Sequence, residues 1–104
     1  MENTTQRRGA EMSKYARRVD GNQLKITKEL RDAGLVVVDM HNVGGGFPDL
    51  LVIYGRKVVL VEVKSSPKER LTPAQVKFHE DWTPSEIIIA WNSKMILDRI
   101  GVKK

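Results

Sequence analysis

Two apolar runs near the middle of the chain are separated by only three residues. Residues 50–54 read LLVIY and residues 58–64 read VVLVEVK, with the polar turn Gly55-Arg56-Lys57 between them. β-Branched residues favour the pleated backbone of a strand, and a short turn that contains glycine makes two such runs lie antiparallel. The sequence therefore predicts a β-hairpin, and the rest of the fold has to be built around it.

Two further segments carry strand signals. Residues 35–40 (LVVVDM) precede the hairpin, and residues 86–91 (EIIIAW) follow it. The second segment is almost entirely apolar, which is typical of a central strand or of one buried on both faces. Between the first strand and the hairpin, residues 43–48 (VGGGFP) form a predicted loop, because three glycines and a proline disfavour both regular structures.

Three helices are predicted from start and stop signals. The first is expected to begin around residues 20–22 and to end at Gly34. The second has Thr72 as its N-cap and Pro73 as its first helical residue, and the third lies between Asn92 and Gly101. The resulting order, α-β-β-β-α-β-α, predicts an α/β fold with a mixed sheet flanked by helices.

The chain has 104 residues, a length that suits one domain. We expect that domain to span residues 19–104, after a flexible basic segment at residues 1–18. The absence of cysteine excludes disulfides and thiolate metal sites. No apolar stretch approaches the length of a membrane span and the N-terminus is too polar for a signal peptide, so a cytoplasmic protein is expected.

The charge balance is basic. Lys and Arg number 18 against 13 Asp and Glu, which gives a net charge of +5. A small basic domain often binds a polyanion, and nucleic acid is the commonest one. A basic surface that only keeps the protein in solution is the alternative, so charge alone does not decide between them.

Three ionisable residues occur where the hairpin is otherwise apolar: Asp49, Glu62 and Lys64. An unpaired charge in an apolar interior is costly, so their position needs a reason. The antiparallel fold-back brings Asp49, at the start of one strand, beside Glu62, near the end of the other. Glu62 and Lys64 are two residues apart and leave the same face of the strand. The sequence therefore predicts that all three converge beside the glycine-rich loop.

Two carboxylates at one sheet edge form a candidate metal site. Carboxylate oxygens are the ligands that Mg²⁺ or Mn²⁺ prefers, and the carbonyl of Val63 could add a third oxygen. Such an ion makes water a better nucleophile and polarises a phosphoryl oxygen. Lys64 could stabilise the charge that develops on phosphorus or orient the attacking water.

These motifs together resemble a known family. Gly46-Phe47-Pro48-Asp49, then Glu62-Val63-Lys64, then Leu71-Thr72-Pro73-Ala74-Gln75 are similar to the motifs of the VRR-NUC branch of the PD-(D/E)XK nucleases. The resemblance covers about residues 20–100 and implies a restriction-endonuclease-like fold. It also implies that Asp49, Glu62 and the Val63 carbonyl bind the metal and that Lys64 is the catalytic lysine. Gln75 resembles a glutamine that the family places beside its active site.

The chain departs from the family at the first helix. Many relatives contribute an acidic residue from this helix, whereas the position that fits best here is Gln23. Asp20 and Glu29 are the nearby acids, and Glu29 can equally be a solvated helix residue. The identity of the fourth site residue therefore stays open.

The two histidines have functional and structural interpretations. His41 precedes the glycine-rich loop and could contact a phosphate or assist proton transfer, and His79 lies one turn after Gln75 on the same side of its helix. A structural or surface role is the interpretation we favour for His41, and the functional case for His79 is no stronger.

Basic residues flank the candidate site in the sequence and could follow DNA phosphates, which would make binding strongly salt-dependent. They are Arg56, Lys57, Lys68, Arg70 and Lys77. No helix-turn-helix, zinc finger or aromatic stacking motif is evident, so recognition of DNA shape is expected rather than of base sequence.

The resulting hypothesis is a metal-dependent, structure-selective DNA endonuclease. Stand-alone members of the family, commonly encoded by phages and bacteria, resemble Holliday junction resolvases, which implies a homodimer acting on four-way or other branched DNA. One alternative is a flap or nicking endonuclease of a phage replication or packaging complex. Another is a non-catalytic DNA-binding module that keeps the fold without the metal.

Overall fold

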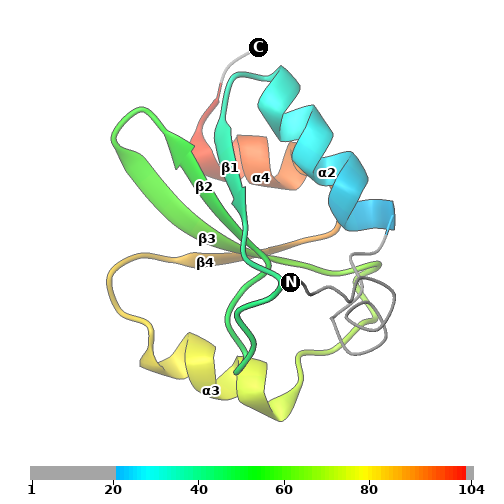
Figure 1. The fold of residues 1–104 in the computed structure, drawn as a ribbon, viewed down its shortest axis with the longest axis vertical. Coiled ribbons are helices and arrows are strands. Elements are labelled where there is room, and N and C mark those ends of the chain that lie inside the picture. The colour runs from blue at the N-terminus through cyan, green and yellow to red at the C-terminus, as the bar shows by residue number, and fades with distance from the viewer. Residues whose placement is uncertain (1–20, 103–104) are drawn as a thin grey trace, which may run out of the picture.

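The computed structural model describes residues 21–102 and arranges them in three helices and four strands (Figure 1). In chain order these are α2 (Gly21–Asp32), β1 (Val36–Asp39), β2 (Leu50–Tyr54), β3 (Lys57–Val63), α3 (Pro73–Asp81), β4 (Ile87–Ala90) and α4 (Ser93–Ile100). The predicted order α-β-β-β-α-β-α is confirmed. The segment predicted to be flexible, residues 1–18, lies outside the described residues, as does Asp20, so the domain boundary at residue 19 stays a prediction.

The strands form one mixed sheet in the order β1-β2-β3-β4. β1 pairs with β2 and β2 with β3 in antiparallel fashion, whereas β3 and β4 are parallel. The hairpin is therefore as predicted, although its turn is one residue shorter, because Lys57 already pairs with Tyr54. Gly55 has a φ of 60° in this two-residue turn, a conformation that glycine adopts without strain.

The prediction that β4 is central or buried on both faces is wrong. β4 is an edge strand, and Ile89 is 41% exposed while Ile88 and Ala90 are buried. The face of β4 that carries Ile88 and Ala90 packs against α4 in the hydrophobic core. An apolar composition indicates that a strand belongs to a sheet but not whether its second face will be covered.

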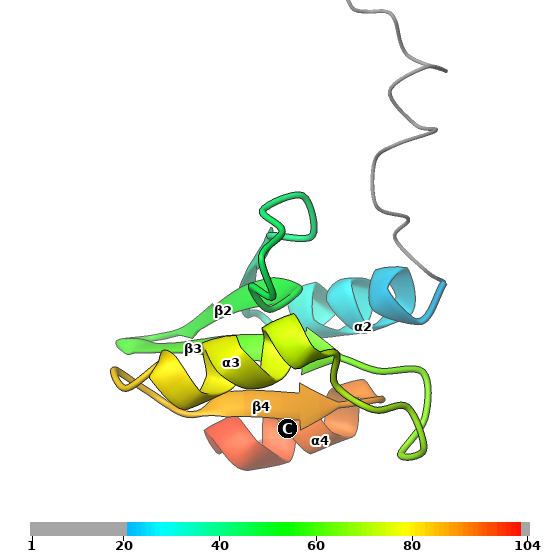
Figure 2. The same ribbon diagram turned by 90° about the horizontal axis from the view of Figure 1, so that it is seen from below.

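The two faces of the sheet have different partners. Figures 1 and 2 show α2 and α4 on one face and α3 on the other. The hydrophobic core lies on the α2 and α4 face, where alternate strand residues such as Val61 and Val63 meet the helices. The helix residues buried there are Ile26, Leu30, Ile96, Leu97 and Ile100. Because side chains alternate along a strand, Glu62 and Lys64 project from the opposite face, the one on which α3 lies.

α3 has no buried residue, so its position depends on specific contacts rather than on a core. Its predicted N-cap is confirmed: the Thr72 hydroxyl accepts a hydrogen bond from the Gln75 backbone N–H, and the Gln75 side chain accepts one from the Thr72 N–H. This reciprocal pair is a capping box. The Phe78 ring also lies 5.1 Å from that of Phe47 in the glycine-rich loop and 5.7 Å from that of Trp82.

The glycine-rich loop packs directly on the first turn of α3. Gly46 has a φ of 84°, and a Cβ at this position would overlap the backbone carbonyl of Ala74 and lie 2.9 Å from the Gln75 nitrogen. Backbone therefore meets backbone at this contact. Glycine is required here for both conformation and space.

A pair of alanine substitutions separates these two requirements. Gly45 also has a positive φ, 65°, but nothing lies within 4 Å of the Cβ it would carry. Gly45→Ala should therefore cost only the backbone strain, about 1–2 kcal/mol of unfolding free energy. Gly46→Ala should cost clearly more, because the loop must also move away from α3. Urea unfolding of both variants measures the difference, and equal losses would mean that the contact with α3 contributes nothing.

Candidate active site

The hairpin register places the two candidate metal-binding carboxylates opposite one another. Leu50 pairs with Val61, so the next residue on each side, Asp49 and Glu62, face each other just beyond the end of β2. One oxygen of Asp49, Oδ2, accepts a hydrogen bond of 2.9 Å from the backbone N–H of Val63. The structure thus places the Asp49 carboxylate beside Val63 of β3, the residue that follows Glu62.

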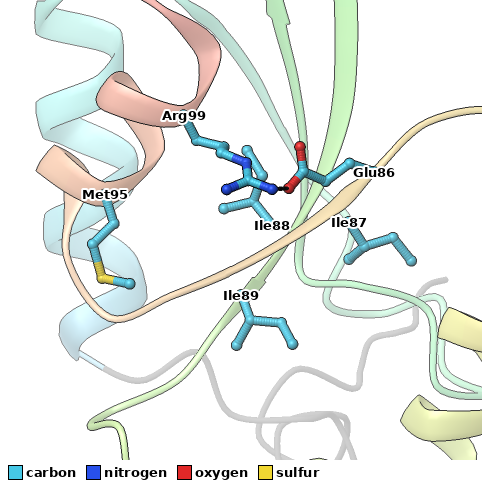
Figure 3. A pocket seen from close by; sticks show the side chains of 6 residues that line it. All are labelled: Glu86, Ile87, Ile88, Ile89, Met95 and Arg99. Atoms are coloured by element: carbon cyan, nitrogen blue, oxygen red, sulfur yellow. Dashed lines mark ion pairs between the residues drawn. The ribbon is translucent and has the colours of Figure 1, made fainter.

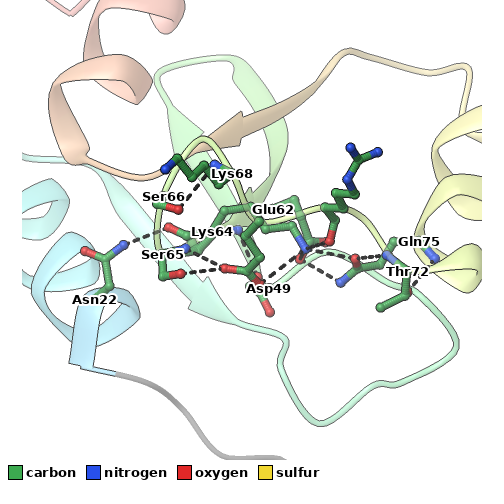
Figure 4. A network of polar contacts seen from close by, with 12 residues as sticks. Asn22, Asp49, Glu62, Lys64, Ser65, Ser66, Lys68, Thr72 and Gln75 are labelled. Carbon is green, nitrogen blue, oxygen red and sulfur yellow. Dashed lines mark hydrogen bonds and ion pairs between the residues drawn. The ribbon is translucent and has the colours of Figure 1, made fainter.

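Glu62 and Lys64 are both enclosed by protein. They are 1% and 3% exposed, and the Lys64 ammonium lies 3.9 Å from Oε2 of Glu62 (Figure 4). Lys64 also donates hydrogen bonds to the Gln75 side chain at 2.9 Å and to the Arg70 carbonyl at 3.3 Å. Two buried ions are stable only if they are paired and hydrogen-bonded, and this network supplies both conditions.

Gln75 joins the two charged residues to α3. Its Nε2 donates to Oε2 of Glu62 at 2.9 Å, while its Oε1 accepts from the Lys64 ammonium and, at 2.8 Å, from the Thr72 backbone N–H. The same side chain therefore completes the capping box and bridges the charged pair. The first turn of α3 and the candidate site form one hydrogen-bonded unit.

The segment after Lys64 contributes an acid that the sequence analysis missed. Glu69 accepts two hydrogen bonds at Oε1 from Ser65, 2.7 Å from the backbone N–H and 2.8 Å from the hydroxyl. Its other oxygen, Oε2, lies 3.7 Å from the Lys64 ammonium. The signal was a serine directly after the lysine with a glutamate four residues later, a spacing that permits a local side-chain cap.

The first turn of α2 ties the ends of three strands together. Asn22 donates from Nδ2 to the Lys64 carbonyl at 2.8 Å and to the Trp91 carbonyl at 3.3 Å, at the ends of β3 and β4. Gln23, 5% exposed, donates to Asp39 at the end of β1 at 3.4 Å. The first helix thus supplies amides that hold the edge of the sheet. Asn22 was missed because its partners are distant backbone carbonyls.

Glu29, the other candidate from the first helix, lies elsewhere. Its carboxylate accepts a hydrogen bond of 2.9 Å from the Ser93 hydroxyl at the start of α4 and lies 4.0 Å from the ammonium of Lys25. Within residues 21–102, no group of three or more acidic or histidine side chains could hold a metal ion. The candidate metal-binding pair within these residues therefore consists of Asp49 and Glu62.

The fold has a counterpart among solved structures. A solved structure described as a "VRR_NUC domain" matches with a TM-score of 0.63 and 25% sequence identity, over 80% of this chain and 94% of that chain. The chain belongs to the VRR-NUC family. No family model and no curated protein matches the sequence. The structural match confirms the resemblance drawn from the three short motifs.

The donor set of this VRR-NUC domain fits a hard divalent cation. Asp49 and Glu62 offer carboxylate oxygens. Val63, whose backbone N–H donates to Asp49, offers its carbonyl oxygen as a third candidate ligand. Mg²⁺ and Mn²⁺ prefer such oxygen ligands, and Mg²⁺ usually keeps several waters when only one or two carboxylates bind it. A site with few protein ligands therefore suits either ion.

His41 of the VRR-NUC domain is paired with an aspartate. Its ring Nδ1 lies 2.6 Å from Oδ1 of Asp39, and its backbone N–H donates to the same oxygen at 2.9 Å. Burial alone would raise the pKa of Asp39, but these contacts with His41 outweigh it and lower the pKa below its ordinary value. The pair follows β1 directly, which agrees with the structural interpretation of His41.

His79 lies on α3 with its Nε2 buried and without a hydrogen-bond partner among the described residues. Burial, with the nearby charge of Lys64, lowers the pKa of His79 below its ordinary value of 6.5. The neutral imidazole is therefore the form that the folded VRR-NUC domain favours.

This shift predicts a pH dependence of stability. The folded state binds the His79 proton more weakly than the unfolded state, so stability is complete above pH 6.5 and falls as the pH decreases through the lower pKa of the folded protein. His79→Leu should remove this part of the acid sensitivity. Urea unfolding of both proteins between pH 7.5 and pH 5 tests it. Parallel pH profiles for the two proteins would contradict the assignment.

The structure separates the five basic residues predicted to contact DNA. Arg56 and Lys57 lie at the turn end of the hairpin, opposite the end that carries Asp49, and Lys57 donates to the Ile100 carbonyl at 2.8 Å. Lys77 lies on α3, 2.9 Å from Asp81. Lys68 and Arg70 belong to the segment that folds over Lys64 (Figure 4). Of the five, Lys68 and Arg70 therefore lie in the segment next to the candidate site.

A pocket of about 220 Å³ lies between β4 and α4. It is separate from the polar network formed by Asp49, Glu62, Lys64 and Gln75. Its lining is both apolar and polar: Ile87, Ile88, Ile89 and Met95 line it together with Glu86 and Arg99, which form an ion pair (Figure 3). None of the residues of the candidate site lines it. The site of this VRR-NUC domain is the polar network beneath α3.

Proposed function

We propose that this VRR-NUC domain is a metal-dependent DNA endonuclease that hydrolyses phosphodiester bonds with Mg²⁺ or Mn²⁺. The fold and the family are those of a nuclease domain. The observation that carries the proposal is the network in which Asp49 faces Glu62 and Gln75 joins Glu62 to Lys64. Two carboxylates and a lysine at one end of the sheet are the groups that phosphodiester hydrolysis needs.

Each residue has a role that its position supports. Asp49, Glu62 and the Val63 carbonyl would hold the divalent cation, which supplies Lewis-acid catalysis and makes water more acidic. Lys64 places a positive charge next to Glu62, where it can stabilise negative charge on the reacting phosphate. Gln75 fixes both side chains in one arrangement, so little reorganisation is required when the substrate binds.

The substrate we propose is branched DNA, cut by a homodimer in the cytoplasm of a bacterial cell. Residues 21–102 form the sheet, the helices that support it and the loops between them. We propose that none of these elements reads the edges of DNA bases. Lys68 and Arg70, beside Lys64, are suited to phosphate contacts, which carry no sequence information. Recognition would then come from DNA shape, and a symmetric dimer would present two sites to two strands.

A cleavage panel tests the proposed function and its substrate together. Four-way junctions, flaps, single strands and linear duplex are incubated with the 104-residue chain and Mg²⁺ or Mn²⁺, and each reaction is repeated with a chelator. We expect junctions to be cut fastest and the chelator to stop all cutting. Preferential cutting of flaps would indicate a flap endonuclease, and binding without cutting of any DNA would indicate a non-catalytic module. Light scattering on the same sample tests the dimer.

No helix within the described part of the chain is both long enough and apolar enough to span a membrane.

A further inference from the structure

The segment from Ser65 to Arg70 folds back over the side chain of Lys64. Ser65 binds Glu69 through both its backbone N–H and its hydroxyl, which closes the segment. The closure also brings the carbonyl of Arg70 to 3.3 Å from the Lys64 ammonium. Lys64 is left with 3% exposure, although it lies in a polar loop region at the end of β3.

The two oxygens of Glu69 have different partners. Oε1 accepts both hydrogen bonds from Ser65, and Oε2 lies 3.7 Å from the Lys64 ammonium. The Ser65 backbone N–H, helped by its hydroxyl and by Lys64, keeps the pKa of Glu69 below its ordinary value of 4.5, so the carboxylate is charged at neutral pH. One side chain therefore closes the segment and faces the lysine at the same time.

Among the described residues, Lys64 has two anionic neighbours, and they differ in their relation to the metal site. Glu62, 3.9 Å away, is one of the two carboxylates that would bind the cation, whereas Glu69 is outside that pair. A divalent cation at Asp49 and Glu62 would take up the charge of Glu62 and repel the Lys64 ammonium. Within residues 21–102, Glu69 is then the carboxylate that remains to hold the ammonium in place.

We infer that Glu69 is a positioning residue that holds the Lys64 ammonium beside Glu62 when the carboxylate pair is engaged by a divalent cation. The inference rests on the proposed function for its effect on catalysis. The contact by which Glu69 holds the Lys64 ammonium does not depend on whether the protein cuts DNA.

Four substitutions separate the charge of Glu69 from the closure of the segment. Glu69→Gln keeps an oxygen that can accept from Ser65 but removes the charge that faces Lys64. Ser65→Ala removes one of the two hydrogen bonds and keeps the charge. Glu80→Gln, at an exposed position on α3, is the matched control for loss of one negative charge. Glu69→Asp keeps the charge on a shorter side chain and serves as the conservative variant.

The kinetic experiment compares kcat and KM of the variants, made in the 104-residue chain, on the DNA that the protein cuts. Glu69→Gln should lower kcat about tenfold and change KM less than about twofold, because a misplaced catalytic group affects the reaction more than binding. Ser65→Ala and Glu80→Gln should stay within about threefold of the parent protein, and Glu69→Asp should recover part of kcat. If Ser65→Ala lowered kcat as much as Glu69→Gln, segment closure rather than charge would be responsible and the inference would fail.

A second readout needs no cleavage. Nitrogen-15 NMR follows the side-chain ammonium signal of Lys64, assigned from its loss in Lys64→Arg, in the presence of Mg²⁺ without DNA. Glu69→Gln should speed exchange of the ammonium protons with water by about threefold or more, and Glu80→Gln should leave it unchanged. An unchanged Lys64 signal in Glu69→Gln would overturn the inference. A parent protein that cuts no DNA but shows the expected NMR change would contradict the proposed function and leave the hold of Glu69 on Lys64 established.

Discussion

Glu62→Gln is expected to abolish metal-dependent cleavage of DNA while the protein stays folded. The substitution keeps the shape of the side chain and an oxygen that can accept from Gln75, but it removes one of the two carboxylate charges that would bind the cation. A bound metal contributes several kcal/mol of transition-state stabilisation, and each 1.4 kcal/mol corresponds to a factor of ten in rate. We therefore expect kcat to fall about 10³-fold or more, and Asp49→Asn to have a similar effect.

Single-turnover cleavage of the best substrate measures this loss, with DNA binding followed separately by a gel shift in Ca²⁺. Glu29→Gln is the matched control, because it also replaces a glutamate by glutamine but lies at Ser93 rather than in the polar network. It should cut DNA at the rate of the parent protein. Cleavage retained in Glu62→Gln, or lost in Glu29→Gln, would mean that the metal-binding acids have been assigned to the wrong helix or strand.

Lys64→Met is expected to cost both activity and stability. The methionine fills the space of the lysine stem but removes the ammonium that lies 3.9 Å from Glu62, a carboxylate that is 1% exposed and faces Asp49. Removing one member of a buried ion pair typically costs about 3–5 kcal/mol, since the remaining charge stays buried. Catalysis should fall by about 10²–10³-fold, the effect of removing one preorganised group that stabilises charge in a transition state.

The double variant Glu62→Gln/Lys64→Met separates these two effects. With both charges removed, no unpaired ion remains at the end of β3, so much of the unfolding free energy should return while cleavage stays absent. Urea unfolding of the two single variants and the double variant measures the coupling. Additive losses would show that Glu62 and Lys64 do not stabilise one another in the folded protein.

The meeting of Asp49, Glu62 and Lys64 could be predicted because it depends on local structure. A short turn fixes the register of a hairpin, and the register fixes which residues face each other. The extent of the contacts of Gln75 could not be predicted in this way, because they depend on where α3 lies relative to the sheet. The resemblance indicated that Gln75 lies near the site, but only the structure shows that one amide joins Glu62, Lys64 and Thr72.

Neighbourhood in the sequence and neighbourhood in space differ for several residues around the site. Arg56 and Lys57 are close to Glu62 in the sequence, yet the hairpin carries them to its far end. Conversely, Asn22 is 42 residues from Lys64 and donates to its carbonyl. β4 was expected to be central or buried on both faces because its composition is apolar, but composition does not show whether a strand has a neighbour on each side.

Position 75 is a compromise between helix stability and the site. Glutamate is a usual capping-box residue at the third position of a helix, and its charge also suits the positive end of the helix dipole. Here a glutamate would lose the donor that binds Glu62 and would place another negative charge against a buried carboxylate. Glutamine can cap the helix and donate to Glu62 with the same amide. Selection for a more stable α3 would therefore oppose selection for an intact site at this residue.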